Sequence, residues 1–121
     1  IVNINPLYRE DVPTSARAIQ NRINEISFNS SLLRELRAIA FVQRLLDTGA
    51  IQTDSMKNVL IHMVADDALM RQLSVATKMV AVPQILHQLR LSGHKACTDF
   101  LETHFDKIGS DSSVDLPAMF S

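Results

Sequence analysis

Apolar residues follow a helical period through the first half of the chain. Between Pro13 and Thr48 no glycine or proline interrupts the sequence. Apolar residues recur there every three or four positions, which is the spacing of one helix face. Thr14 or Ser15 can cap the start, and Gly49 suits the left-handed position after a helix C-terminus. The pattern predicts one long helix, whose apolar stripe is Ile19, Ile23, Ile26, Leu32, Leu36, Ile39, Val42 and Leu46.

A different pattern occupies residues 58–64, Asn-Val-Leu-Ile-His-Met-Val, where nearly every position is apolar. Such a run is typical of a strand buried on both faces of a parallel sheet, and a buried turn of helix is the alternative. We predict a strand over residues 59–64. Ile1, Val2 and Ile4 indicate a second strand, which Asn5 and Pro6 end. A chain that opens within a strand, and whose sheet needs more strands, is expected to be a segment of a larger α/β unit.

The rest of the sequence, after the apolar run at residues 58–64, predicts short helices. Asp66 or Asp67 can cap a helix that runs to about Leu73. Pro83 suits the first turn of the next helix, with Gly93 after its end. The inward residues of that helix are predicted to be Ile85, Leu86 and Leu89. Ser92 can cap a last helix, ended by Gly109, whose apolar stripe is Cys97, Leu101, His104 and Ile108. We expect a single segment over residues 1–121, mainly α with one or two strands, and a flexible tail at residues 110–121.

Composition narrows the function classes. The formal net charge is -1 and the sequence pI is about 6.5, which argues against a nucleic-acid-binding protein such as a helix-turn-helix regulator. Cys97 is the single cysteine, so no internal disulfide can form. No apolar run approaches the ~20 residues that a membrane span needs. A cytoplasmic protein, or one at the periphery of a membrane, is the expectation.

Few residues suggest chemistry. Asp66 and Asp67 follow the predicted parallel strand, where α/β sheets place ligands and catalytic groups, but helix capping alone accounts for both. Cys97 lies on the apolar stripe of its helix, where cysteine usually behaves as a small buried hydrophobe. We expect His62 to be a hydrogen-bonded core residue. The four histidines lack the spacing of a metal site; they are His62, His87, His94 and His104.

Charged residues of the long helix indicate a solvated face rather than an anion site. They are Arg34, Glu35, Arg37 and Arg44. The sequence contains no G-x-S-x-G, no G-x-G-x-x-G and no P-loop. We therefore assign no catalytic, cofactor-binding or metal-binding residue in this chain, and no cofactor.

Several stretches resemble the C-terminal portion of bacterial patatin-like phospholipases, over about residues 3–108. The most specific part spans residues 21–39 and contains Ile-Asn-Glu-Ile-Ser-Phe-Asn followed by Leu-Leu-Arg-Glu-Leu-Arg-Ala-Ile. Asn5-Pro6-Leu7 precedes it. Val-Leu-Ile-His at residues 59–62, Asp66-Asp67, Leu-His-Gln-Leu-Arg at residues 86–90 and Gly93 follow in matching order. Val82-Pro83 departs from the polar helix start of the relatives, which puts the local loop geometry in doubt.

The resemblance implies an α/β/α fold and a Ser–Asp dyad that hydrolyses acyl esters of phospholipids or other lipids. In that family the serine elbow, the Gly-rich oxyanion loop and the Asp-Gly dipeptide all precede the matched region. This segment would then support the catalytic sheet and would be inactive alone. The alternative is a helical protein–protein interaction module without enzymatic activity.

If further strands of the sheet lie outside these residues, the helices and the predicted strand would leave apolar surface uncovered. We expect the segment to dimerise, or to stay bound to the remainder of its parent enzyme. A self-sufficient monomeric bundle is the alternative. The residues expected to face the partner are Ile19, Ile23, Leu32, Leu36 and Ile39.

Overall fold

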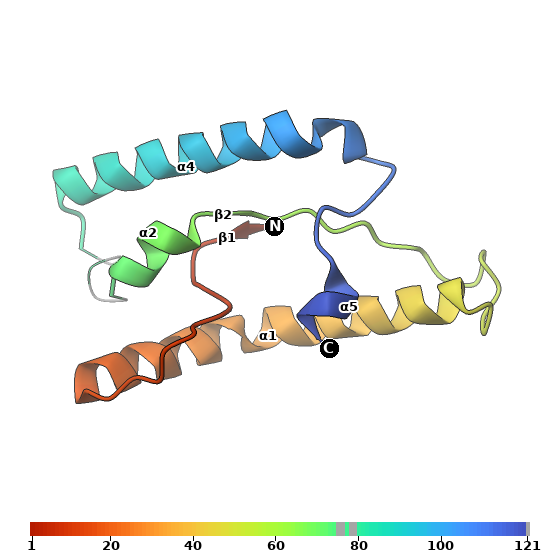
Figure 1. Cartoon of the computed structure of the whole chain (residues 1–121), viewed down its shortest axis with the longest axis horizontal. Coiled ribbons are helices and arrows are strands. Elements are labelled where there is room, and N and C mark those ends of the chain that lie inside the picture. The colour runs from red at the N-terminus through yellow and green to blue at the C-terminus, as the bar shows by residue number, and fades with distance from the viewer. Residues whose placement is uncertain (75–76, 78–79, 121) are drawn as a thin grey trace.

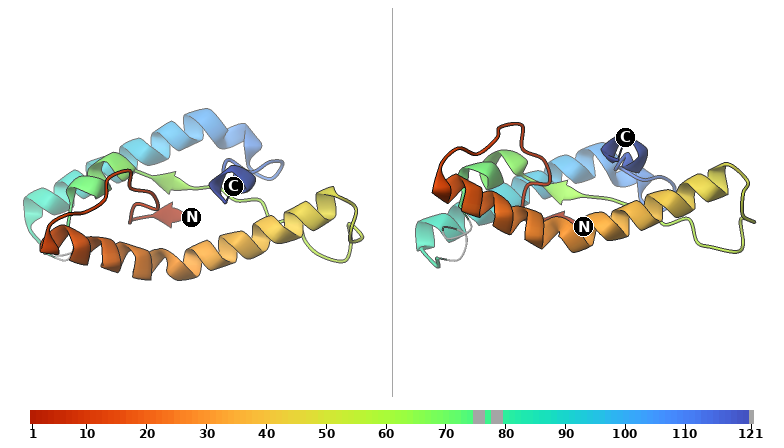
Figure 2. Two further views of the ribbon diagram at one scale, coloured as in Figure 1. Left: turned by 60° about the horizontal axis from the view of Figure 1, so that its bottom comes forward. Right: turned by 90° about the horizontal axis from the view of Figure 1, so that it is seen from below.

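The computed structural model describes residues 1–74, 77 and 80–120 (Figure 1). The chain is mainly helical, with one two-stranded parallel sheet formed by β1 (Val2–Asn3) and β2 (Val64–Ala65). Two long helices, α1 (Ala16–Asp47) and α4 (Pro83–His104), lie on opposite sides of this sheet (Figures 1 and 2). The described elements therefore form three thin layers, helix, sheet and helix.

Helix α1 confirms the prediction of one long helix. Ser15 is the N-cap, and its hydroxyl accepts a hydrogen bond from the Ala18 amide at 3.2 Å. Gly49, just beyond the C-cap Thr48, has φ +68°. That is the left-handed conformation that glycine adopts at low steric cost. The polar stretch at residues 29–31 does not break the helix.

The sheet confirms the parallel pairing but corrects the strand boundaries. β1 and β2 pair with Val2 opposite Val64 and Asn3 opposite Ala65. Of the predicted strand at residues 59–64, only Val64 belongs to β2, and residues 58–63 have no regular secondary structure. Burial on both faces was also wrong, because within residues 58–64 only Ile61 is buried.

Helix α4 corrects the prediction of two helices separated at Gly93. The helix runs unbroken from Pro83 to His104, with Gly93 in its interior. A single glycine in a helix costs only about 1 kcal/mol relative to alanine, so it does not end a helix by itself. A short 3₁₀ turn, η1 (Phe105–Lys107), follows, and Gly109 then takes φ +90°.

The inward face of α4 changes because the helix is continuous. Its half-buried residues continue the register of Ile85 and Leu89 through Ser92, Ala96 and Phe100. Of the predicted stripe, His104 lies on this face and is half-buried, whereas Cys97 lies one position off it and is exposed. Leu101 and Ile108 are accordingly exposed, as is Leu86, which was predicted to point inward.

The C-terminal segment, for which a flexible tail was predicted over residues 110–121, contains a short helix that contacts α1. Helix α5 (Leu116–Met119) packs on α1, and Leu116 is only 1% exposed. The Asp115 carboxylate caps α5 by accepting a hydrogen bond from the Ala118 amide at 2.9 Å. Leu36, Leu116 and Ile61 form the buried core, with Leu32 and Ile39 packed against it. Residue 121, the last of the predicted tail, lies outside the described residues.

The predicted partner-facing stripe of α1 is divided in two. Leu32, Leu36 and Ile39 contribute to the core of the chain itself. Ile19 and Ile23 are 43% and 50% exposed. Only the N-terminal part of the stripe therefore stays uncovered within the described chain.

Candidate functional site

A largely apolar hollow lies between the sheet and α4. Its volume is about 440 Å³. We call it the sheet hollow. Main contributors to its wall are Val2, Ile4, Val64, Met70, Leu89 and Cys97. Because Val2 is 77% exposed and Ile4 52%, the hollow is open beside β1. Walls of this kind suit apolar side chains or an acyl chain.

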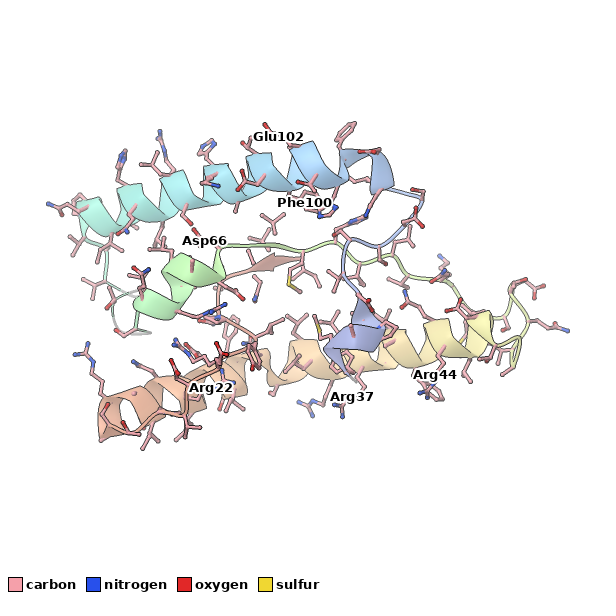
Figure 3. All side chains as sticks on the ribbon, in the orientation of Figure 1. Arg22, Arg37, Arg44, Asp66, Phe100 and Glu102 are labelled. Atoms are coloured by element: carbon pink, nitrogen blue, oxygen red, sulfur yellow. The ribbon has the colours of Figure 1, made fainter. Side chains whose placement is uncertain are left out.

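Asp66 stands at the rim of the sheet hollow, at the start of helix α2 (Asp67–Gln72), between α2 and α4 (Figure 3). One carboxylate oxygen accepts a hydrogen bond from the Leu69 amide at 3.0 Å, and the other accepts one from the Ser92 hydroxyl at 2.7 Å. The Leu69 amide, followed by Ser92, lowers the pKa of Asp66. Both oxygens are thus engaged in capping α2 and tying it to α4. Capping is the role the sequence favoured for this residue over that of a catalytic base.

The neighbouring acid has a weaker contact. Asp67 lies 3.8 Å from the guanidinium of Arg71 along the same helix. This exposed i, i+4 pair is worth a few tenths of a kcal/mol at most. Asp66 and Asp67 therefore do not converge on a common reacting position.

Cys97 does not occupy the buried position that was predicted for it. Cys97 is exposed and lies on the wall of the sheet hollow. His94, the nearest histidine in the sequence, is also exposed, as is His87. Nothing in this arrangement provides the buried base and oxyanion donors that a thiol nucleophile needs.

Two histidines flank one phenylalanine of α4. The rings of His62 and Phe100 meet edge to face at 5.8 Å, and those of Phe100 and His104 lie 5.5 Å apart. Nδ1 of His62 and Nδ1 of His104 are enclosed without a hydrogen-bond partner. His62 is half-buried, so the hydrogen-bonded core histidine expected from the sequence is replaced by an aromatic contact. Among the described residues no group of three or more His, Cys, Asp or Glu side chains could hold a metal ion.

A buried carboxylate on α1 escaped the sequence analysis. The Glu25 side chain is 2% exposed. It accepts hydrogen bonds from Arg9 Nε at 2.7 Å and Arg9 Nη2 at 2.6 Å, and Arg22 Nη1 adds a third at 3.3 Å. Arg9 is the principal cause of the lowered pKa of Glu25, and Glu25 raises the pKa of Arg9. We call these three residues the Glu25 cluster; it anchors the loop after β1 to α1.

The same face of α1 carries a second buried polar residue. Asn29 is 3% exposed and donates through Nδ2 to the Pro6 carbonyl oxygen at 3.1 Å. A signal for both residues was available. From Leu36, successive steps of four, three and four positions toward the N-terminus reach Leu32, Asn29 and Glu25, so all four lie on one face of the helix. The isoleucine pattern pointed to a neighbouring face instead.

The charged residues of α1 that were predicted to form a solvated face are exposed. Arg34, Arg37 and Arg44 are exposed along with Glu35. Figure 3 shows Arg37 and Arg44 on the side of α1 that faces away from α4. Their guanidinium groups lie over aromatic rings, Arg37 over Phe120 at 5.2 Å and Arg44 over Phe41 at 5.4 Å. Such contacts shield apolar surface rather than bind anions.

Comparisons with known proteins identify no relative: no family model, no curated protein and no solved structure matches this chain. None of the described helices has the length and apolar character to cross a membrane.

Proposed function

We propose that this chain is the C-terminal part of a patatin-like lipid acyl hydrolase, in which α1 and α4 are outer layers on a longer parallel sheet. The observation that carries the proposal is the parallel pair β1–β2 between two long helices. Parallel strands occur almost only in sheets whose two faces are covered by helices. Two strands of two residues each form only a small part of such a sheet.

Exposed apolar side chains support the same architecture. Val2 and Ile4 are exposed beside the sheet hollow, and Ile19, Ile23 and Ile26 are 43–54% exposed on α1. Ile19, Ile23 and Ile26 lie on a neighbouring face of α1 from the buried Glu25 and Asn29, whereas a longer sheet between the same helices offers apolar surface to Val2 and Ile4. At roughly 25 cal/mol per Å² of buried apolar surface, covering them favours association with the missing layer.

The chemistry would lie outside this segment. In the proposed enzyme an aspartate takes the proton of the nucleophilic serine, and backbone amides stabilise the tetrahedral oxyanion. The residues described here supply a strand pair, the helices that hold it and one wall of an apolar hollow. The substrates are acyl esters of lipids, and the enzyme acts in the cytoplasm or at a membrane periphery.

The alternative of a helical interaction module has the exposed Ile19 and Ile23 in its favour. It required residues 58–64 to continue a helix. The run is instead non-helical and leads into a parallel strand pair. An all-helical module would not contain such a pair. The hydrolase segment is therefore the function that accounts for more of the geometry.

The test is hydrolysis of a short-chain nitrophenyl ester by the complete natural polypeptide that carries this segment. We expect turnover by that polypeptide, and none above a heat-inactivated control from the 121 residues alone. A matched control exchanges the serine of any G-x-S-x-G elbow in the complete polypeptide for alanine. Absence of such an elbow, or an inactive but folded complete polypeptide, would defeat the proposal.

A further inference from the structure

The backbone groups of the strand pair show which edge of the sheet is open. The Ile1 nitrogen donates to the His62 carbonyl oxygen at 2.8 Å, and the Val64 amide donates to the Ile1 carbonyl oxygen at 2.9 Å. His62 and Val64 thus direct these groups toward β1. Backbone groups alternate in direction along a strand. In this register Val2 turns its N–H and C=O away from β2, toward the outer edge of β1.

On the opposite side, the extended chain just before β2 already has a partner. Ile61, which alternates with His62, directs its backbone groups away from β1. Its amide donates to the Ser112 hydroxyl at 2.9 Å, and its carbonyl oxygen accepts a hydrogen bond from the Ser113 amide at 3.0 Å. The C-terminal segment therefore closes this side of the extended chain just before β2, and α5 then packs on α1. The backbone groups of Ile61 are therefore not available to a further strand, whereas those of Val2 point to an open edge.

Side chains beside β1 match an apolar neighbour. Asn3 is 7% exposed, whereas Val2 is 77% exposed and borders the sheet hollow. Leu89 and Ala96 of α4 form the roof of the hollow. Strands lie about 4.8 Å apart, so a strand added beyond β1 would place alternate side chains at the open mouth of this hollow.

We propose that the outer edge of β1 accepts a further strand of the parent hydrolase, parallel to β1 and hydrogen-bonded to the N–H and C=O of Val2. This strand directs apolar side chains into the sheet hollow. The inference rests on the proposed function for the identity of the partner. The order of the sheet is then added strand, β1, β2, with the segment at residues 112–113 beyond.

Two substitutions at one position separate backbone pairing from side-chain contact. Val2→Pro keeps an apolar side chain and removes the amide hydrogen that points to the open edge, while sparing the hydrogen bonds to β2. Val2→Thr keeps that amide and makes the side chain more polar. In the complete polypeptide we expect Val2→Pro to lower the melting temperature by several degrees more than Val2→Thr does. An equal or smaller effect of Val2→Pro overturns the proposal.

Hydrogen exchange on the unmodified polypeptide keeps the test decisive if Val2→Pro does not fold. We expect the Val2 amide to exchange at least ~100-fold more slowly than an unprotected amide. Exchange at the unprotected rate, or protection that appears only at concentrations where the protein dimerises, overturns the proposal. A protected Val2 in a polypeptide without esterase activity would refute the hydrolase function and leave the added strand. An active enzyme with an unprotected Val2 amide would refute the added strand and leave the hydrolase function.

Discussion

Replacing Glu25 by alanine removes the acceptor on which Arg9 and Arg22 converge. The carboxylate accepts three hydrogen bonds, two from Arg9 and one from Arg22, and its side chain is 2% exposed. Hydrogen bonds to charged groups contribute about 1.5–3 kcal/mol each to stability. Breaking a buried pair by removing one partner costs about 3–5 kcal/mol, since the remaining charge stays buried.

The expected loss for Glu25→Ala is below that range. The Arg9 and Arg22 side chains are 26% and 24% exposed, so both can regain part of their hydration after the carboxylate is removed. We expect a loss of about 2–3 kcal/mol in the free energy of unfolding. Glu35, exposed on the same helix, provides the matched control, and Glu35→Ala should change stability by less than about 0.5 kcal/mol.

The assay is urea unfolding followed by circular dichroism at 222 nm. If Glu25→Ala and Glu35→Ala unfold at the same urea concentration, the Glu25 cluster does not hold the loop after β1, and the reasoning is refuted. Loss of the anchored loop without loss of helix would appear as faster hydrogen exchange at residues 7–12 alone.

The pH dependence gives a second readout of the same cluster. Hydrogen bonds from Arg9, the largest cause, lower the pKa of Glu25 below its ordinary value of 4.5. A lowered pKa in the folded state means that the unfolded state binds protons more readily in this range. The contribution of Glu25 is therefore complete above about pH 5 and is lost as the pH falls from 4.5 through the folded-state pKa. The stability difference between wild type and Glu25→Ala should shrink over that window.

Three further predictions test the core packing, the cap of α2 and two glycines. Leu36→Ala should cost about 2–5 kcal/mol in urea unfolding because Leu36 is 1% exposed, whereas Leu91→Ala, 53% exposed, should cost under about 1 kcal/mol; equal losses would contradict the assigned core. Asp66→Ala should lose about 1 kcal/mol, since it removes the cap of α2 and the bond to Ser92, and an unchanged midpoint would argue against that role. Gly93→Ala should raise the melting temperature, because the added methyl group meets no atom within 4 Å and alanine favours the helix interior. Gly109→Ala should lower the melting temperature, because the φ angle of Gly109 is +90°. Calorimetry that shows shifts of the same sign for both variants would refute this.

Local signals determined the ends of α1 and the cap of α2. Ser15 accepts from the amide three residues later, Gly49 takes the left-handed conformation, and Asp66 caps α2. These features depend on neighbouring residues only, so the sequence predicted them. The parallel direction of the strand pair was also predictable, because a continuous apolar run after a crossover helix is typical of parallel sheets.

The partner of the apolar run on the side away from β1 was decided by tertiary contacts. The apolar run at residues 58–64 has strand composition, but the outward backbone groups of Ile61 bond to Ser112 and Ser113, 51 and 52 residues away. Local propensity carries no information about that pairing. The same contact orders the C-terminal segment, and Leu116 then has a core to join.

The orientation of both long helices was likewise beyond local pattern. In the N-terminal half of α1 the isoleucines suggested an inward face, yet Glu25 and Asn29 are the buried residues there, because Arg9 and the Pro6 carbonyl oxygen from the preceding loop hydrogen-bond to them. On α4 the helix continues through Gly93, and the inward register therefore passes through Ala96 and Phe100 instead of Cys97. Burial of a polar group depends on a partner that is distant in sequence, and only the tertiary structure brings that partner into place.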